Sequence, residues 1–223
     1  MVKDLGTVKE LRRLAMGRSN IYYLLSSVFL NRPSYKVIKV VLNEDFLFGI
    51  SRVIDDDRGV KLLKRFAKNF RHSRKEYEAL ANEYRELFLA SGSRYVIPYE
   101  TAYREEDVLE DVKNMFRVAR INTARLHEPL DHFGIELWFM YCICYMEARG
   151  WTKRNRDFAL RCLEMGREFL ENHLLLWAGK LCDQIIVHSK LDFYKGVAGI
   201  TKGYIKQDYI EVKEAIKEAR DLT

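Results

Sequence analysis

The sequence contains little glycine and proline, with 12 glycines and three prolines among its 223 residues. Average usage is about 7% glycine and about 5% proline. Because β-sandwiches and barrels need a turn every few residues, this shortage argues against them and favours long helices. The 48% hydrophobic content and only four cysteines exclude disordered, collagen-like and disulfide-framework classes. We expect residues 1–223 to form a single domain with its own core.

The chain also lacks a long apolar run. The longest uncharged stretches, residues 19–31 and 137–146, fall short of the ~20 apolar residues that span a bilayer. Residues 1–9 carry charges and contain no apolar core of a secretory signal. We therefore expect a cytoplasmic protein that makes no stable membrane insertion and keeps its cysteines reduced.

Motifs of metal and catalytic sites are missing as well. The sequence has no Cys-x-x-Cys pair, glycine-rich phosphate loop or Gly-x-Ser-x-Gly elbow. None of the five histidines follows a glutamate by three residues, so the Glu-x-x-His pattern of di-iron bundles is absent. Cys142 and Cys144 would lie ~200° apart around a helix and could not share a metal. We expect no catalytic residue, no metal and no cofactor.

Neither sign of charge dominates strongly. The chain has 38 Lys and Arg against 32 Asp and Glu, a net charge of +6, and the charges are interspersed as on an ordinary helical surface. Two alternatives stay open. One is a helical nucleic-acid-binding protein that uses the basic surface, although no helix-turn-helix or basic stripe is visible. The other is a helical enzyme with His132 and nearby carboxylates as acid and base.

Apolar residues recur at three- and four-residue intervals along most of the chain, and no strand-like alternation appears. This pattern predicts an all-α, single-domain bundle of about ten helices. The segment 129–148 is apolar on nearly all sides and should lie at its centre. Glu105, Glu106 and Asp107 should lie in the first turn of their helix, where the dipole favours acids. The predicted helices are 8–30, 34–42, 61–70, 74–89, 105–120, 129–148, 154–170, 173–188, 191–205 and 208–220.

Three groups of residues could carry a function. The first is a stripe at helical spacing, which is either core packing or the wall of an aromatic groove: Tyr77, Leu80, Tyr84, Leu87 and Phe88. The second is an apolar loop with one carboxylate, which either caps the core or binds a ligand: Pro98, Tyr99, Glu100 and Tyr103.

The third group, residues 128–136, opens the central predicted helix, with Pro129 expected at its first position. Asp131 should then lie in the first turn. Glu128, His132 and Glu136 are four residues apart and should share one face. The group is either an acidic helix start with a hydrogen-bonded histidine or part of a binding surface.

In their order and spacing, the three groups resemble the TorD/DmsD family of cytoplasmic redox-enzyme maturation chaperones. The matching motifs are Tyr84-x-x-Leu87-Phe88, Pro98-Tyr99-Glu100 with Tyr103, and Glu128-Pro-Leu-Asp131-His132 before Gly134-Ile135-Glu136. Similar residues also occur in 22–33, 169–177 and 192–194, so the resemblance covers nearly the whole chain.

This resemblance implies an all-helical, TorD-like fold without catalytic turnover. Its partners would be the twin-arginine leader and the apo catalytic subunit of a molybdopterin oxidoreductase, which the chaperone holds until cofactor insertion and export. No nucleic acid is expected, and a homodimer that exchanges helices is compatible with such a fold. The leader-binding residues implied by the family pattern are Tyr84, Leu87, Phe88, Pro98, Tyr99, Glu100, Glu128, Asp131, His132 and Glu136.

The charge distribution is consistent with a basic ligand. Residues 91–140, which contain the second and third groups, hold nine acidic and six basic residues. This segment is therefore acidic within a basic chain. Its carboxylates could pair with the guanidinium groups of a leader, and the aromatic residues could contact its apolar part.

Overall fold

The computed structural model, which describes residues 2–104 and 107–222, confirms the all-α class. No strand occurs in these residues, and Tyr99 and His132 form an isolated antiparallel bridge. A 3₁₀ turn covers Glu100–Ala102 and a π-helical turn covers Leu170–Leu174. The α-helices are α1 (Val2–Phe29), α2 (Tyr35–Val41), α3 (Glu44–Ser51), α4 (Arg58–Asn69), α5 (Arg74–Phe88), α6 (Val108–Val118), α7 (Phe133–Thr152), α8 (Arg156–Phe169), α9 (Leu175–His188) and α10 (Asp192–Arg220).

Several helices begin where a short polar side chain satisfies a free backbone N–H group. Ser34 accepts a hydrogen bond from the Val37 N–H at the start of α2. Ser73 and Glu76 form a reciprocal capping box at the start of α5. These bonds satisfy donors that have no partner within the helix, so the starts of α2 and α5 are encoded locally.

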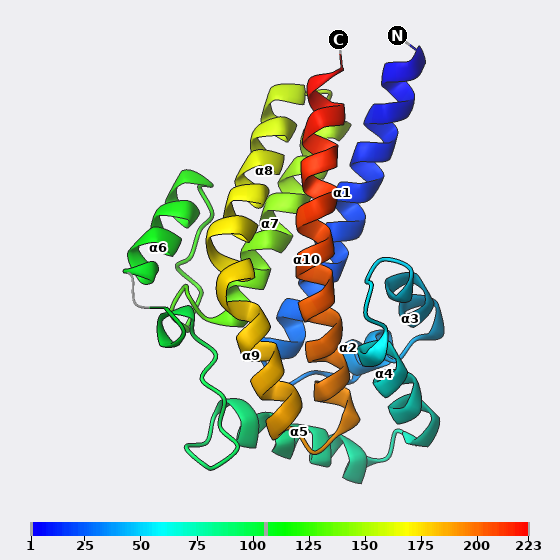
Figure 1. The fold of residues 1–223 in the computed structure, drawn as a ribbon, viewed down its shortest axis with the longest axis vertical. Helices are drawn as coiled ribbons and strands as arrows, with labels where there is room; N and C mark the ends of the chain where they lie inside the picture. Colours follow the sequence, from blue (N-terminus) through cyan, green and yellow to red (C-terminus); the bar gives the residue numbers. More distant parts are fainter. Residues whose placement is uncertain (1, 105–106, 223) are drawn as a thin grey trace.

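The long helices α1, α7, α8 and α10 run side by side, and both termini lie at the same end of the molecule (Figure 1). Helix α1 packs along α7, while α10 packs against α4, α8 and α9. Helices α2 to α5 surround the opposite end, and α6 lies on the flank beside η1. The core includes the fully buried side chains of Tyr22, Phe139, Trp151, Phe169 and Trp177. Helix α7 supplies much of this core, although its Tyr145 ring is 41% exposed.

Several predicted boundaries are wrong, and the first helix begins at Val2, six residues before its predicted start. Helix α3 was not expected, although Asn43 caps it and Glu44 and Asp45 lie in its first turn. Helix α7 continues past its predicted end at residue 148 to Thr152. Gly150 lies inside it, where a missing Cβ allows close packing against α8. A Cβ built there would lie 2.9 Å from the Cβ of Ala159 on α8.

The segments 191–205 and 208–220 form one helix, α10, instead of two. Asp208 has the chemistry of a helix start. In the structure it lies within α10, and its buried carboxylate pairs with Arg18 of α1. The predicted first-turn residues Glu105 and Glu106 lie outside the described residues. The third, Asp107, is not in the first turn, because it is the N-cap of α6, which begins at Val108. No helix in the described part of the chain is long and apolar enough to cross a membrane.

Candidate functional site

The second and third sequence groups lie directly against each other. The Phe133 N–H donates a 2.8 Å hydrogen bond to the Pro98 carbonyl, and the Glu100 N–H donates a 3.0 Å bond to the Asp131 carbonyl. Between these bonds, the rings of Tyr99 and His132 pack edge to face, with centroids 5.3 Å apart. The short bridge therefore joins two segments that the sequence only suggested belong together.

Helix α7 begins at Phe133, so the expected start at Pro129 is wrong. His132 is the N-cap, and its Nδ1 accepts a 3.0 Å hydrogen bond from the Gly134 N–H. Pro129 instead begins a turn, in which its carbonyl accepts from the His132 N–H. Glu128, His132 and Glu136 consequently do not share a helical face. A histidine cap is a weaker sequence signal than the proline, because capping residues are usually Ser, Thr, Asp or Asn.

Asp131 precedes the cap and does not lie in the first turn of α7. Its carboxylate is buried and accepts hydrogen bonds from the Thr101 hydroxyl (2.7 Å) and the Thr101 N–H (3.3 Å). Asp131 thus holds the 3₁₀ turn in place with both its main chain and its side chain. Thr101 has no obvious signal in the sequence.

A buried polar cluster lies behind this turn. Glu100 accepts hydrogen bonds from Arg104 (2.6 Å) and pairs with His173 Nδ1 (2.9 Å). Glu136 accepts a 3.0 Å bond from the Trp177 indole N–H. Burial and the nearby Glu100 carboxylate raise the pKa of Glu136 well above its usual range, which favours its protonated form. Glu100 and Glu136 are both fully buried, so the cluster joins η1, α7 and the η2–α9 segment from inside.

The first sequence group is largely core. Leu87 and Phe88 are buried, and Phe88 packs edge to face against Phe29 of α1. The Tyr84 hydroxyl donates a 3.2 Å hydrogen bond to the Phe29 carbonyl. The aromatic stripe therefore fixes α5 against the end of α1, and Tyr84 is the member that also reaches a surface groove.

This groove, which we call the Glu128 groove, has a volume of about 540 Å³. Glu128 is half-buried at its edge and accepts a 2.8 Å hydrogen bond from the Tyr99 hydroxyl. Leu89, 66% exposed, adds apolar surface. The groove is lined by Leu30, Asn31, Arg32, Glu78, Ala81, Asn82, Tyr84, Arg85, Leu89 and Glu128.

The chemistry of the site is that of binding. The groove combines the exposed Leu89 and the edge of the largely buried Tyr84 with a carboxylate that keeps accepting capacity beyond its bond to Tyr99. Such a carboxylate can pair with a guanidinium group, and the apolar wall can contact a hydrophobic side chain. No group of three or more His, Cys, Asp or Glu residues that could hold a metal occurs in residues 2–104 and 107–222.

The His132 ring gives a pH-dependent prediction. Burial lowers the pKa of His132 from 6.5 to about 4, so below pH 6.5 the unfolded chain binds a proton that the folded chain does not. Stability is therefore lost as the pH falls from 6.5 to 4. His132→Asn retains a capping acceptor but does not titrate. We expect it to lose about 3 kcal/mol less stability than the unsubstituted protein across this range.

Urea unfolding at neutral pH and at pH 4 measures this difference. His127→Asn is the matched control, because His127 is exposed and an exposed ring is solvated similarly in both states. Parallel losses of stability for His132→Asn and the unsubstituted protein would contradict the prediction.

Comparisons with known proteins show which family the chain resembles. Residues 55–183 match the family model described as nitrate reductase delta subunit. The chain is similar to "Chaperone protein TorD" of Vibrio cholerae serotype O1 (strain M66-2), 24% identical over 220 residues that cover 95% of this chain and 99% of that protein. It is also similar to "Chaperone protein TorD" of Psychrobacter sp. (strain PRwf-1), 28% identical over 142 residues that cover 58% and 60% of the two chains.

Proposed function

The chain belongs to the nitrate reductase delta subunit and TorD chaperone family, and from this premise we propose that it binds the twin-arginine leader of a molybdopterin-dependent oxidoreductase subunit. As a family member it is a redox-enzyme maturation chaperone and is not catalytic. In the proposed role it holds the apo subunit in the cytoplasm until the cofactor is inserted, and then allows export.

The observation that carries this proposal is the position of Glu128. Its carboxylate is half-buried, lines the same groove as Tyr84 and Leu89, and is oriented by the Tyr99 hydroxyl. A guanidinium group can bind such a carboxylate through two parallel hydrogen bonds. The apolar part of a leader can then lie against Tyr84 and Leu89. Arg32 and Arg85 also line the groove and repel a basic peptide, whereas Glu78 adds a second carboxylate to the lining.

We propose that the remaining implied residues act mainly by shaping this surface. Pro98 and His132 hold the bridge that carries Tyr99, and Asp131 fixes the turn behind it. The others are buried in the core or in the polar cluster and support the groove from inside: Leu87, Phe88, Glu100 and Glu136.

Glu128→Gln tests the role of the charge. Glutamine keeps an oxygen that accepts the Tyr99 hydrogen bond but removes the negative charge. A charge-assisted hydrogen bond contributes roughly 1.5 to 3 kcal/mol, so we expect affinity for a fluorescent twin-arginine leader peptide to fall about tenfold to hundredfold. The melting temperature should stay close to that of the unsubstituted protein.

Glu218→Gln is the matched control, because Glu218 is exposed on α10, whose C-terminal end lies far from α5 (Figure 1). It should bind the leader normally. A second peptide with both arginines changed to lysine should bind the unsubstituted protein more weakly, since lysine cannot make the bidentate contact. Equal affinities for Glu128→Gln, the control and both peptides would refute the proposal.

A further inference from the structure

A second groove lies between α2, α3 and α4, and we call it the lysine groove. Its volume is about 810 Å³. No residue lines both this groove and the Glu128 groove. The lysine groove is lined by Lys39, Leu42, Asn43, Glu44, Asp45, Leu47, Phe48, Lys64, Ala67, Lys68 and His72.

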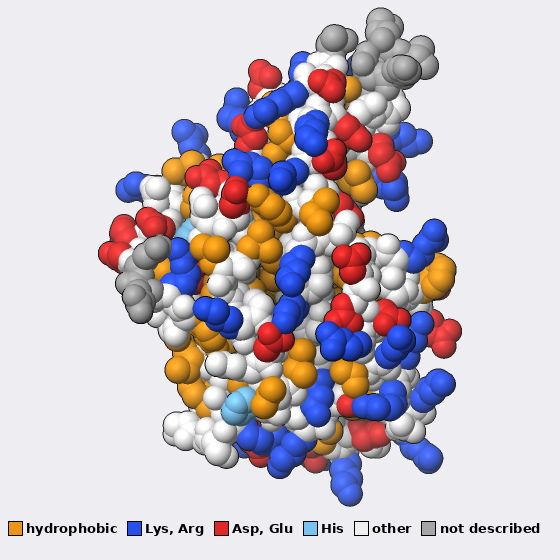
Figure 2. Space-filling model, in the orientation of Figure 1, with side chains coloured by type: hydrophobic (Ala, Val, Ile, Leu, Met, Phe, Trp, Pro, Cys, Tyr) orange, Lys and Arg blue, Asp and Glu red, His pale blue; other side chains and the backbone are white. Residues whose placement is uncertain are grey.

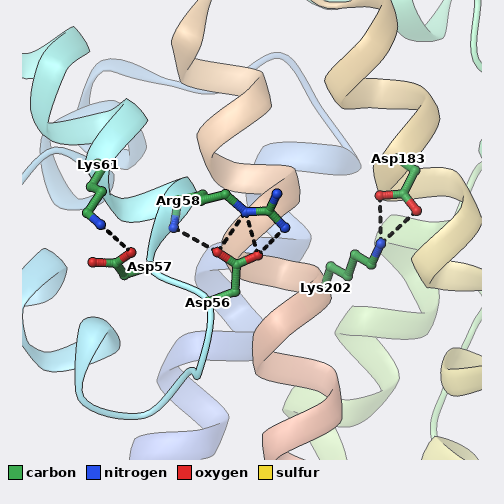
Figure 3. Close-up of polar contacts among 6 residues, drawn as sticks. All are labelled: Asp56, Asp57, Arg58, Lys61, Asp183 and Lys202. Carbon is green, nitrogen blue, oxygen red and sulfur yellow. Dashed lines mark hydrogen bonds and ion pairs between the residues drawn. The ribbon is translucent and has the colours of Figure 1, made fainter.

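The lysines of this groove differ from the other cations on α4. Of the other cations on α4, Arg58 pairs with Asp56, and Lys61, which lies three residues before Lys64 on the same face, pairs with Asp57 (Figure 3). Arg65 pairs with Asp192 of α10. Within the described part of the chain, by contrast, no acidic side chain pairs with the groove's three lysines: Lys39, Lys64 and Lys68.

The spacing of these lysines concentrates their charge. Lys64 and Lys68 are four residues apart and therefore lie on the same face of α4, while Lys39 faces them from the last turn of α2. Figure 2 shows more Lys and Arg than acidic side chains over the lower right of the molecule, where Figure 1 places α4 and its surroundings. The groove thus has unneutralised positive charge on two of its sides.

Apolar surface accompanies the charge. Phe48 of α3 is 60% exposed, and the Arg52 guanidinium lies 5.7 Å from its ring centroid. Leu42 and Ala67 are half-buried and line the same groove. An exposed aromatic ring beside unpaired cations is the composition of a protein-binding surface, because aromatic residues contribute much of the energy in such interfaces.

We propose that the lysine groove binds an acidic polypeptide segment that carries a large apolar side chain. Carboxylates of the segment pair with Lys39, Lys64 and Lys68, and its apolar residue packs on Phe48 and Leu42. Charge complementarity carries this choice of partner. The segment is chemically opposite to a twin-arginine leader, whose arginines the lysines repel, so the two grooves take different ligands.

The acidic residues of the groove favour a protein over a nucleic acid. Glu44 and Asp45 lie in the first turn of α3 and line the same groove. They would repel a continuous phosphate backbone, which presents charge at every unit. A peptide can place carboxylates at the lysines only and turn polar or basic groups toward Glu44 and Asp45.

The test uses the full chain and a charge-reversed variant, Lys64→Glu/Lys68→Glu. The probe is an array of fluorescent peptides rich in Asp and Glu, each with one central Leu or Phe. Its counterparts carry Asn and Gln in place of the acids, or Ser in place of the apolar residue. The matched control is Lys213→Glu/Lys217→Glu, which has the same spacing and the same change of net charge on the exposed surface of α10.

We expect acidic peptides with an apolar residue to bind the unsubstituted protein and the control equally. The groove variant should bind at least about tenfold more weakly at low salt, since attraction becomes repulsion. The difference should shrink as salt screens the charges. Phe48→Ala should also weaken binding, and peptides without acids or without the apolar residue should bind poorly.

Three results would overturn the proposal. The unsubstituted protein could bind no acidic peptide, or the groove variant and the control could bind the acidic peptides equally. The third is that Lys64→Glu/Lys68→Glu reduces binding to random RNA or to anionic vesicles more than binding to the peptides. The twin-arginine leader is titrated in parallel. Its binding should be unaffected by Lys64→Glu/Lys68→Glu, so failure of this proposal and failure of leader binding are distinguishable.

Discussion

Arg18→Leu is expected to lower the free energy of unfolding by about 3 to 5 kcal/mol. Arg18 of α1 is buried, with its Nε 2.6 Å from an Asp208 oxygen and its Nη1 2.8 Å from a Glu147 oxygen. The substitution leaves two buried carboxylates without their cation. Leucine keeps part of the buried aliphatic stem of the arginine, so the loss reports mainly the uncompensated carboxylates.

The loss from Arg18→Leu should depend on pH. Burial raises the pKa of Glu147 to about 7 even with Arg18 present, and removing the cation raises it further. A carboxyl whose pKa is raised on folding loses stability as the pH rises above its unfolded value of 4.5. The deficit of the variant should therefore grow between mildly acidic and alkaline pH.

Urea unfolding across this pH range measures both effects. The control is Arg13→Leu on the same helix, because Arg13 pairs with Glu10 at the exposed surface. Exposed pairs contribute little, so this variant should stay within about 0.5 kcal/mol of the unsubstituted protein. A loss for Arg18→Leu no larger than that of the control would show that the buried network does not hold α1 to α7 and α10.

Gly59→Ala should lower the free energy of unfolding by about 3 kcal/mol, the upper part of the range for overpacking. A Cβ at Gly59 of α4 would lie 2.7 Å from the Gly196 carbonyl oxygen and 2.8 Å from the Ile200 nitrogen of α10. Both atoms belong to the backbone of a long helix, so neither can move away as a flexible side chain could. The two helices would have to separate.

Gly49→Ala is the matched control for Gly59→Ala. Gly49 lies inside α3, and a Cβ there meets nothing within 4 Å. Alanine is favoured over glycine in a helix by about 0.5 to 1 kcal/mol, so this variant should be slightly more stable than the unsubstituted protein. Thermal and urea unfolding would contradict the prediction if both substitutions had the same sign.

Most of the helical architecture could be predicted from the sequence. Scarce glycine and proline, helical apolar spacing and local caps such as Ser34 and Ser73 indicate where α2 and α5 begin. The motifs that resemble the chaperone family can be read directly from the sequence, and their order along the chain is sufficient to indicate the family. The caps and the apolar spacing are local signals, because each acts within one helix or one turn.

The sequence was less informative about the site. Pro129 predicted the start of α7, yet the helix begins after His132, because Gly134 donates to the His132 ring and Phe133 donates to Pro98. The same bridge buries Asp131 and exposes Glu128 to the groove. Which motif residues reach the surface is thus decided by a contact between two loops that are distant along the chain.

The continuity of α10 and its packing against α4 were also decided by contacts between distant segments and not by local sequence. Asp208 has the local chemistry of a helix start, but a guanidinium 190 residues away in the sequence makes it a mid-helix core residue. Gly59 and Gly196 carry no local signal for their role, since only the crossing of α4 and α10 requires a missing Cβ. Hydrophobic spacing and caps determined where helices form. Buried charge pairing and backbone contact between helices determined where the helices continue, cross and leave a groove. The free energies of these contacts arise only when distant segments of the chain meet, so the sequence alone does not reveal them.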